Sequence, residues 1–502
     1  MTDAAIMKLQ NGSDIRGVAL EGIADEHVNL SADVCNRIGQ AFAHWLAKDT
    51  DKPEKRLTVG IGRDSRISGP ALEDAVISGL VSQGVTVIRC GLATTPAMFM
   101  SLVFPETHFD GSIMITASHL PYNRNGIKFF DKDGGLEHED ITDILSLASS
   151  EQVIQASCSG CASYDLITLY ARHLEKNIRD GVKTDSHVPL KGLKIVVDAG
   201  NGDAGFFVTN ILKPLGADTT GSQFLEPDGM FPNHIPNPEN PAAMDAIRKA
   251  VLDNHADFGL IFDTDVDRMS AVLPDGTEVN RDAIIAMISA ILAPDYPGST
   301  IVTDSVTSDR LTYFLEQILH LKHHRFQRGY KNVINECKRL NKSGTVSPLA
   351  METSGHGALK DNYYLDDGAF LAVKLVIALA NAKQEGKHLA SLIEKLPPLV
   401  EAEEIRFKIL TEDYKTYGAQ VLDIFEQNAK EAELELPVSY EGVRISFHDE
   451  NVKGWMLLRL SLHDPVMPFN IEGEHTGDCE KLKKLAKKLL KGCDKLDLSP
   501  LN

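Results

Sequence analysis

One short segment, residues 116–128, contains the side chains of this chain best suited to chemistry. It combines the hydroxyl of Ser118, the imidazole of His119 and the ammonium group of Lys128, and it follows an apolar run at 113–115. Turn residues such as Pro121 favour a tight loop after a buried strand, which predicts a rigid, exposed position for Ser118. A serine placed in this way can carry a phosphoryl group. A decorated surface turn is the alternative, because a short motif alone is only a hypothesis.

A second segment brings carboxylates together directly after the apolar run 258–261. It has aspartates at alternate positions: Asp263, Asp265 and Asp267. Their oxygens can converge on a hard divalent cation such as Mg²⁺ or Ca²⁺, and without a cation three such charges would repel one another. An EF-hand is excluded, because Arg268 and Pro274 stand where that loop needs glycine and glutamate. We therefore predict an open cation site, and Ser118 or its phosphate is the natural further ligand.

Two kinds of loop add groups that recognise phosphate and sugar. Glycine-flanked arginines occur at 12–17 and 60–66, and arginine binds phosphate through a planar fork. A late loop, 351–357, combines a carboxylate, a hydroxyl and an imidazole, in Glu352, Ser354 and His356. These groups suit the hydroxyls of a sugar. Each loop taken alone can also be an ordinary surface loop.

Composition restricts the class of protein. The chain has 502 residues, 43% of them hydrophobic, and a formal net charge of −20. This length predicts several domains, and the acidic balance argues against nucleic-acid and anionic-membrane partners. An anionic substrate would therefore need a local basic funnel. The candidates for this funnel are Arg16, Arg63, Arg66, Lys128, Arg268, Arg328, Lys331 and Arg459.

Location and redox chemistry follow from what the sequence contains. It has no run of about 18 apolar residues, and its first residues do not form a signal peptide. Seven scattered cysteines fit a reducing compartment, so we expect a cytoplasmic protein. A plastid stroma would also fit a chain whose transit peptide had been removed. Cys158 and Cys161 form the one closely spaced pair, with free thiols as the default and structural zinc or a redox switch as alternatives.

Alternating strand and helix patterns recur along the chain. Strands are predicted at 57–61 and 85–89 around a helix at 69–83. The same pattern recurs with a strand at 193–197 and a helix at 203–213, and again with a strand at 300–302 and a helix at 308–319. Such units form parallel or mixed sheets covered on both faces. A helical stretch at 385–398 ending in two prolines and a polar segment at 181–191 are the predicted linkers.

The last predicted helix, 479–492, is basic and amphipathic. Such a helix can bind a membrane or calmodulin. We expect instead that its leucine face packs on the last domain, because it lacks aromatic anchors.

Taken in this order, the motifs resemble the α-D-phosphohexomutase superfamily, which includes phosphoglucomutase, phosphomannomutase and phosphoglucosamine mutase. The segment 116–119 resembles its phosphoserine loop, 263–268 its metal loop and 352–356 its sugar-specificity loop. The proline-rich segment 226–239 is similar to the crossover of the phosphoglucomutase/phosphomannomutase branch. The resemblance runs from about residue 12 to about residue 473.

The resemblance implies an α/β fold, with three related α/β domains with mixed sheets and a smaller C-terminal α+β domain. The expected domains are a phosphoserine domain at 1–187, a metal-binding domain at 188–297, a sugar-recognition domain at 298–402 and a phosphate-binding domain at 403–502. It implies Mg²⁺ as cofactor and a hexose 1,6-bisphosphate as activator and intermediate. The implied reaction interconverts the 1-phosphate and 6-phosphate of glucose, with mannose as a further substrate.

The resemblance also implies roles for individual residues. Ser118 would carry the phosphoryl group and share the cation with the three aspartates, while Lys128 and His356 transfer protons. A lysine among cations can have a lowered pKa, which suits a base. His119 would steady the serine loop, and Arg16 and Arg268 would support the transferring group. The expected substrate-binding residues are Arg63, Arg328, Lys331, Glu352, Ser354, His356, Arg459 and Ser461.

The chain departs from the family pattern in two loops. Thr264 and Val266 stand where glycines are usual in the metal loop, so we expect this backbone to avoid positive φ. The C-terminal phosphate loop, 459–468, keeps Arg459, Ser461 and Pro465. It has Leu462 for the usual glycine, His463 for threonine and Pro468 in place of a second arginine.

These departures leave other functions open. A phosphoglucosamine mutase is the nearest alternative, and a hexose-bisphosphate synthase or phosphatase would use the altered loop differently. A sugar-phosphate-binding regulator without catalysis is the non-enzyme alternative. The sequence leaves the oligomeric state, monomer or dimer, open.

Overall fold

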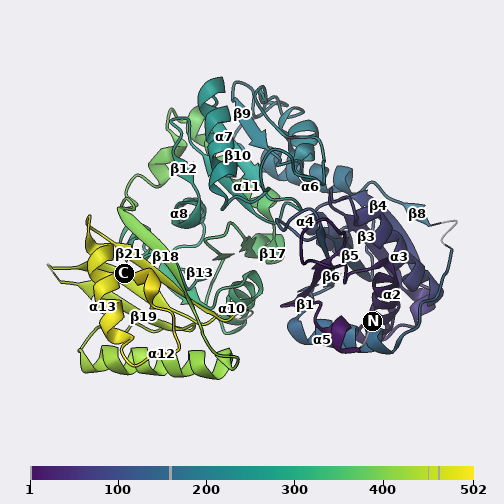
Figure 1. Cartoon of the computed structure of the whole chain (residues 1–502). Coiled ribbons are helices and arrows are strands. Elements are labelled where there is room, and N and C mark those ends of the chain that lie inside the picture. Colours follow the sequence, from purple (N-terminus) through teal and green to yellow (C-terminus); the bar gives the residue numbers. More distant parts are fainter. Residues whose placement is uncertain (1–2, 158–160, 450, 462–463, 502) are drawn as a thin grey trace. The chain divides into compact units, whose positions relative to one another are not determined.

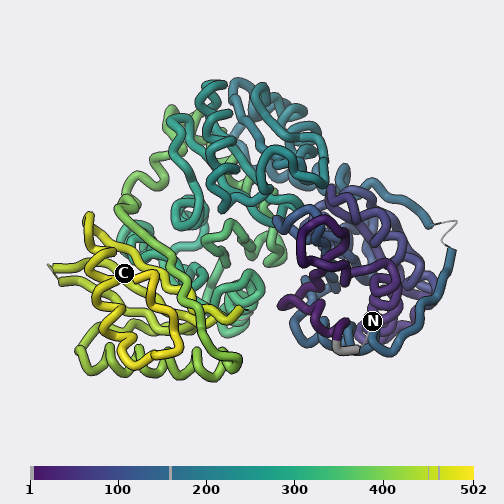
Figure 2. Tube along the Cα trace, in the orientation of Figure 1, coloured from purple at the N-terminus to yellow at the C-terminus, as the bar shows by residue number. Residues whose placement is uncertain are grey.

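The computed structural model describes residues 3–157, 161–449, 451–461 and 464–501, and Figures 1 and 2 trace the chain through its helices and strands. The chain forms two compact units. The first comprises Met1–Asn280 with Ser354–Ser391, and the second comprises Arg281–Thr353 with Leu392–Asn502. Both units contain sheets covered by helices.

The N-terminal sheet of the first unit is mixed. Its strands follow the order β1-β2-β6-β5-β3-β4-β8, with β7 pairing β6. The bounds are β1 Gln10–Asn11, β2 Asp14–Val18, β3 Thr58–Arg63, β4 Thr86–Leu92, β5 Gly111–Ile115, β6 Arg124–Asp131, β7 Gly134–Gly135 and β8 Ala162–Ser163. β3 is parallel to β4 and β5, whereas β6 is antiparallel to β2 and β5.

Alternate side chains of a strand point to opposite faces of the sheet. Since the side chains of β3 and β5 are buried on both faces, helices are needed to cover this sheet. The helices are α1 Asp3–Met7, α2 Ala32–Thr50, α3 Gly69–Ser82, α4 Thr95–Val103, α5 His138–Ser150 and α6 Leu166–Gly181, with a short turn η1 Glu54–Arg56. Val59 and Ile61 of β3 share a buried core with α2 and α3, which lie together in Figure 1. A Cβ on Gly62 would lie 2.6 Å from the sulfur of Met98 in α4, so glycine allows this close approach.

The second sheet of the first unit presents the metal loop. Its order is β12-β11-β10-β9, with β9 Ile195–Asp198, β10 Phe258–Phe262, β11 Met269–Val272 and β12 Glu278–Val279. β9 and β10 are parallel, and α7 Pro241–Asn254 packs on them through a buried core. The predicted helix at 203–213 is a turn followed by a π-helix, η2 Phe207–Leu212. The unit is completed by β16 Gly357–Leu359, η4 Lys360–Asn362, β17 Leu365–Asp366, α11 Gly368–Gln384 and η5 Leu389–Leu392.

The second unit contains an α/β part and a C-terminal part. In the α/β part, the parallel strands β13 Thr300–Asp304, β14 Lys322–Phe326 and β15 Leu349–Met351 accompany α8 Arg281–Leu292, α9 Asp309–Tyr313, η3 Phe314–Ile318 and α10 Tyr330–Lys342. In the C-terminal part, the antiparallel sheet β18-β21-β20-β19 is formed by β18 Glu401–Lys408, β21 Val466–Gly473, β20 Lys453–Leu458 and β19 Val443–His448. It carries α12 Tyr414–Glu431, α13 Asp478–Leu489 and the final turn η6 Ser499–Leu501.

These elements confirm the predicted fold class. The basic helix α13 buries Leu482 and Leu489 in the core of the C-terminal sheet, as its leucine spacing indicated. The helix predicted at 385–398 is wrong: α11 ends at Gln384, and η5 is the helical turn within that range. Among the described residues, no helix is both long and apolar enough to cross a membrane.

Candidate active site

Ser118 lies in the loop between β5 and β6, and the fold holds it rigidly. Its φ of 49° is in the left-handed region, and its N–H donates to Oγ1 of Thr116 at 2.9 Å. Its Oγ donates to Oδ2 of Asp263 at 2.8 Å and accepts from Nη2 of Arg268 at 2.9 Å. The expectation of an exposed serine is wrong, because Ser118 is only 6% exposed. The metal loop covers this hydroxyl.

Arg66 explains the rigidity of the serine loop. Its guanidinium donates to the backbone carbonyls of Ser118 at 2.5 Å, Leu120 at 2.6 Å, Pro121 at 2.8 Å and Arg124 at 3.0 Å. The residue is 1% exposed. Arg66 was expected in the basic funnel, but these contacts use its donors on backbone oxygens, so it clamps the loop instead.

The metal loop follows β10 and places its carboxylates together. One oxygen from each of Asp263, Asp265 and Asp267 lies within 4.8 Å of the others, and all three residues are at most 1% exposed. Oδ1 of Asp265 and Oδ1 of Asp267 are buried without a hydrogen-bond partner. Unpartnered buried carboxylate oxygens carry a large desolvation cost, which a hard cation bound to them would offset. The residues present therefore fit a divalent cation.

The pKa values of two aspartates in the cluster shift in opposite directions. Burial, and then the neighbouring Asp267 and Asp265, raises the pKa of Asp263 well above its usual value. Burial alone would also raise the pKa of Asp267, but Lys128, His356 and Arg268 outweigh it and hold that pKa below its usual range. Asp267 is therefore the carboxylate of this pair that keeps its charge.

Val266 corrects the expected backbone of the metal loop. It adopts a φ of 66°, although a β-branched residue in this region is a steric outlier. The residue is fully buried, and its carbonyl accepts from the N–H of Gly368 at 3.1 Å. Surrounding structure therefore enforces the turn that glycine usually provides, which is typical of strain at functional sites.

Cationic side chains surround Ser118 and the aspartates. Nζ of Lys128 lies 2.5 Å from Oδ2 of Asp267 and 3.2 Å from Oδ2 of Asp265, so its direct partners are anions rather than the cations expected. Arg16 projects from β2, pairs with Asp14 at 2.8 Å and donates to the carbonyl of Thr116 at 3.4 Å.

His119 contacts Arg268 through Nδ1. Burial, and then the charges of Arg268 and Arg16, lowers the pKa of His119 to about 2. His119 is therefore neutral and can accept a hydrogen bond from Arg268.

His356 has partners that the sequence did not reveal. Its Nδ1 lies 2.5 Å from Oδ2 of Asp366 and 3.8 Å from Oδ1 of Asp267. Burial would lower the pKa of His356, but Asp366 and Asp267 outweigh it and raise the pKa to about 9. A histidine that is protonated at neutral pH can donate a proton, so the structure adds Asp366 to the candidate site. The available signal was the pair Asp366 and Asp367, which in the structure precedes α11 with Asp367 as its N-cap, and such a pair reads only as a helix cap.

Thr95 is a second residue that sequence reasoning missed. Its hydroxyl donates to Oδ2 of Asp265, and its N–H donates to the carbonyl of Asp265 at 3.0 Å. Thr95 begins α4, so this helix supports the metal loop. A threonine before proline at a helix start gave no indication of this role.

The remaining predicted residues make no contact with this cluster that the described hydrogen bonds and ion pairs include, and each is described within its own unit. Arg63 pairs with Glu73 at 3.1 Å, and Ser354 is 7% exposed within the first unit. In the second unit, Glu352 accepts from the N–H of Gly329 at 2.6 Å, and Arg459 lies 3.6 Å from Glu441. The same unit also contains Arg328, Lys331 and Ser461.

Some residues of the predicted phosphate loop and of the predicted cysteine pair lie outside the part of the chain that the structure describes. Pro468 lies in β21, and its carbonyl accepts from the N–H of Arg459 at 3.1 Å. Leu462 and His463 lie outside the described residues. So does Cys158, and with it the hypothesis of a paired Cys158 and Cys161.

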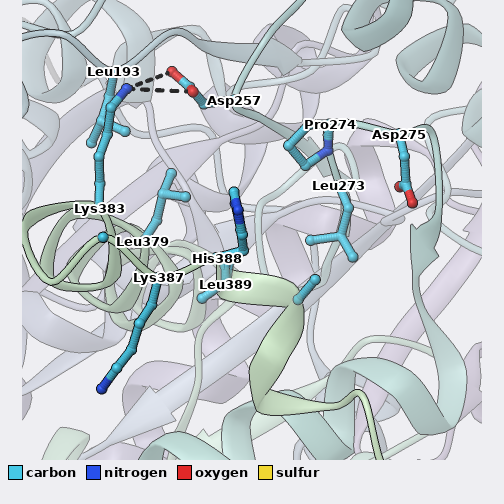
Figure 3. A pocket seen from close by; sticks show the side chains of 12 residues that line it. Leu193, Asp257, Leu273, Pro274, Asp275, Leu379, Lys383, Lys387, His388 and Leu389 are labelled. Atoms are coloured by element: carbon cyan, nitrogen blue, oxygen red, sulfur yellow. Dashed lines mark hydrogen bonds and ion pairs between the residues drawn. The ribbon is translucent and has the colours of Figure 1, made fainter.

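A pocket of about 430 Å³ occurs in the first unit, and Ser118 is not among the residues that line it (Figure 3). Its wall includes Asp257, which precedes β10, whereas the metal loop follows the other end of this strand. Lys383 reaches Asp257 at 3.3 Å, and the side chains of Leu193 and Leu389 contribute apolar surface. No residue of the candidate active site lines it.

Comparisons with known proteins agree with this arrangement. The three α/β/α domain models of phosphoglucomutase/phosphomannomutase match residues 7–153, 169–276 and 280–400. A phosphomannomutase/phosphoglucomutase of Pseudomonas putida is 29% identical over 472 residues, 94% of this chain and 92% of that protein. A phosphoglucosamine mutase of Limosilactobacillus reuteri is 32% identical over 401 residues, 77% of this chain and 81% of that protein.

Solved structures give the same result. The crystal structure of a phosphoglucomutase/phosphomannomutase family protein from Burkholderia thailandensis has a TM-score of 0.79 and 27% identity, and covers 98% of both chains. The fold and the site are those of the α-D-phosphohexomutases, enzymes that move a phosphoryl group within a sugar phosphate. Within this class, the chain belongs to the phosphoglucomutase/phosphomannomutase family.

Proposed function

We propose that this enzyme interconverts hexose 1-phosphates and 6-phosphates, of glucose and also of mannose, through a phosphorylated Ser118. One observation carries the proposal: Oγ of Ser118 lies 2.8 Å from Asp263 in the three-carboxylate cluster and 2.9 Å from the guanidinium of Arg268. A buried hydroxyl between a cation-binding cluster and an arginine is suited to carrying a phosphoryl group. Phosphomannomutase/phosphoglucomutase relatives support the choice of sugars.

We propose Mg²⁺ as the cation, held by Asp263, Asp265, Asp267 and the serine oxygen. When bound, Mg²⁺ would neutralise charge that develops on the phosphoryl oxygens. The chain supplies the remaining functions. Arg268 and Arg16 attract the transferring phosphoryl group. His119 is neutral, so its Nδ1 can accept a hydrogen bond from Arg268 and adds no further positive charge to the site.

Proton transfer is assigned to His356 and Lys128. His356, held protonated by Asp366, can donate a proton to the oxygen that leaves. Lys128 bridges Asp265 and Asp267, and its ammonium group would exchange a proton with a sugar hydroxyl beside these carboxylates. The sugar must then turn over as the 1,6-bisphosphate, which would also act as the activator. We assign its recognition to Arg63, Arg328, Lys331, Glu352, Ser354, His356, Arg459 and Ser461.

The domain organisation and location belong to the same proposal. We divide the chain into a phosphoserine domain at 1–187, a metal domain at 188–297, a sugar domain at 298–402 and a phosphate domain at 403–502. The scattered cysteines support a reducing compartment such as the cytoplasm.

The test is intact mass spectrometry before and after incubation with glucose 1,6-bisphosphate. We expect a gain of one phosphoryl group that is absent in Ser118→Ala, together with loss of mutase activity in this variant. Assays with the 1-phosphates of glucose, mannose and glucosamine then identify the sugar. Accumulating bisphosphate or free phosphate would indicate a synthase or phosphatase instead. Unchanged activity in Ser118→Ala would contradict the mechanism.

A further inference from the structure

Arg459 lies at the start of the altered phosphate loop, and one neighbouring carboxylate is placed to orient it. Oε1 of Glu441 lies 3.6 Å from Nη1 of Arg459. The pairing of β19 with β20 joins Val443 to Leu458, so Gly442 faces the beginning of the loop. A Cβ on Gly442 would lie 2.1 Å from the carbonyl oxygen of Leu458, and its φ is 65°. Only glycine allows this close approach, which brings Glu441 beside Arg459.

The other oxygen of Glu441 reaches the neighbouring α/β part of the same unit. Oε2 accepts from the hydroxyl of Ser305 at 2.5 Å and from the N–H of Arg328 at 3.1 Å. Ser305 directly follows β13, and Arg328 precedes α10. One carboxylate therefore connects Arg459 of the C-terminal sheet to two loops of the α/β part.

Contacts around Glu441 keep it in this position. The carbonyl of Tyr440 accepts a hydrogen bond from Nε2 of Gln327 at 3.0 Å. The centroid of the Tyr440 ring lies 5.0 Å from the ring centroid of Phe326 and 5.2 Å from that of His324. The side chain of Glu441 is 18% exposed. Both parts of the unit thus fix the segment that presents this carboxylate.

The electrostatics of this region favour an anion. Burial lowers the pKa of Arg459, Glu441 opposes this shift, and Arg328 adds to the lowering. Both residues contact Glu441, Arg459 through its guanidinium and Arg328 through its backbone N–H, and an anion shared between the two arginines would relieve the repulsion of their charges. Glu441 contacts Nη1, whereas Nε of Arg459 is buried without a hydrogen-bond partner. The ion pair with Glu441 uses one end of the guanidinium, and the Arg459 side chain remains 11% exposed, so further N–H donors of this group can face a phosphate.

We propose that Glu441 is a positioning residue for an anion subsite in which Arg459 and Arg328 bind the non-reacting phosphate of a hexose phosphate. This inference rests on the proposed function. It accounts for the proline at 468, where the family pattern has a second arginine. The carbonyl of Pro468 supports the backbone of Arg459, and Arg328, whose N–H donates to the same carboxylate of Glu441, would supply the second cation. The subsite includes residues of both parts of the second unit, and Glu441 holds Arg459 of the C-terminal part next to Ser305 and Arg328 of the α/β part.

The test compares acceptors that have and lack the second phosphate. Enzyme phosphorylated on Ser118 is reacted with glucose 1-phosphate or with free glucose, for wild type, Glu441→Gln, Ser305→Ala and the control Glu435→Gln. Glu435 is an exposed carboxylate of the same domain that pairs with His448. We expect Glu441→Gln to raise KM for glucose 1-phosphate about tenfold, with a smaller rise in Ser305→Ala. The kcat, the reaction with free glucose and the control should remain unchanged.

An equal loss with both acceptors would show that Glu441 is only structural, and an unchanged KM in both variants would also overturn the inference. If Glu441→Gln fails to fold, Ser305→Ala decides. A separate measurement distinguishes failure of the proposed function: calorimetric binding of glucose 6-phosphate to Ser118→Ala, with and without Glu441→Gln. About tenfold weaker binding in the double variant supports the subsite even if the enzyme proves not to be a mutase, and equal binding contradicts it.

Discussion

Nδ1 of His356 and Oδ2 of Asp366 are 2.5 Å apart, and this pair sets the charge of the proposed proton donor. Burial alone would favour the neutral imidazole. Asp366 and Asp267 reverse this preference and raise the pKa of His356 to about 9. The histidine is therefore an acid at neutral pH and loses its proton only in alkaline solution.

Asp366→Asn should shift the alkaline limb of the pH profile. The raised pKa keeps wild-type His356 protonated up to about pH 9, so an activity that needs this proton should decline above that pH. Removing the carboxylate should lower this limit by about one to two pH units. The measurement is kcat/KM for glucose 1-phosphate from pH 6 to 10, with the remote Asp275→Asn as control. An unchanged alkaline limb would assign the acid to another residue.

Thr95→Val should weaken cation binding although it replaces none of the proposed ligands. The variant keeps the shape of threonine but loses the hydroxyl that orients Asp265. Removing such an outer contact typically costs about 10- to 100-fold in metal affinity. Activity is measured against Mg²⁺ concentration, and half-maximal activity should need at least about tenfold more Mg²⁺. Thr95→Ser retains the hydroxyl and should resemble wild type. If both variants need equally more Mg²⁺, packing rather than the hydrogen bond supports the loop.

The sequence predicted the reacting groups because they stand in continuous loops. The spacing of Asp263, Asp265 and Asp267 needs only a turn after a strand to bring their oxygens together, and the structure shows this turn. The sequence did not reveal Thr95 or Asp366, because tertiary packing selects the partners of Asp265 and His356. Residue type alone does not specify such contacts.

Backbone-directed contacts were equally hard to predict. An arginine beside glycines reads as a phosphate ligand, yet Arg66 binds four carbonyls of the serine loop. Val266 has a positive φ that local sterics disfavour, because buried surroundings enforce it. In both cases, the tertiary environment outweighs a sound local rule.

Arg66→Ala should therefore reduce stability. The substitution removes the guanidinium donor from the carbonyls of Ser118, Leu120, Pro121 and Arg124. It also leaves Asp64 buried without this cation. We expect urea unfolding to show a loss above about 3 kcal/mol, and Arg66→Lys should recover little because one ammonium cannot replace a planar fork. The control is Arg406→Lys, at an exposed arginine paired with Glu404. Normal stability with a raised KM for substrate would instead support anion binding by Arg66.

Glu472→Gln should change how stability depends on pH in the second unit. Glu472 accepts from the hydroxyl of Ser308. Burial raises its pKa from 4.5 to about 7; Asp282 adds to the rise, while Ser308 and Arg310 oppose it. Because the folded state holds this proton more tightly than the unfolded state, its contribution to stability is complete below pH 4.5. It is lost as the pH rises to about 7. Urea unfolding should show wild type losing up to about 3 kcal/mol relative to Glu472→Gln between pH 4.5 and pH 8. Glu474→Gln, at an exposed position two residues later, should follow wild type. Parallel curves for wild type and Glu472→Gln would show that this carboxyl does not titrate on unfolding.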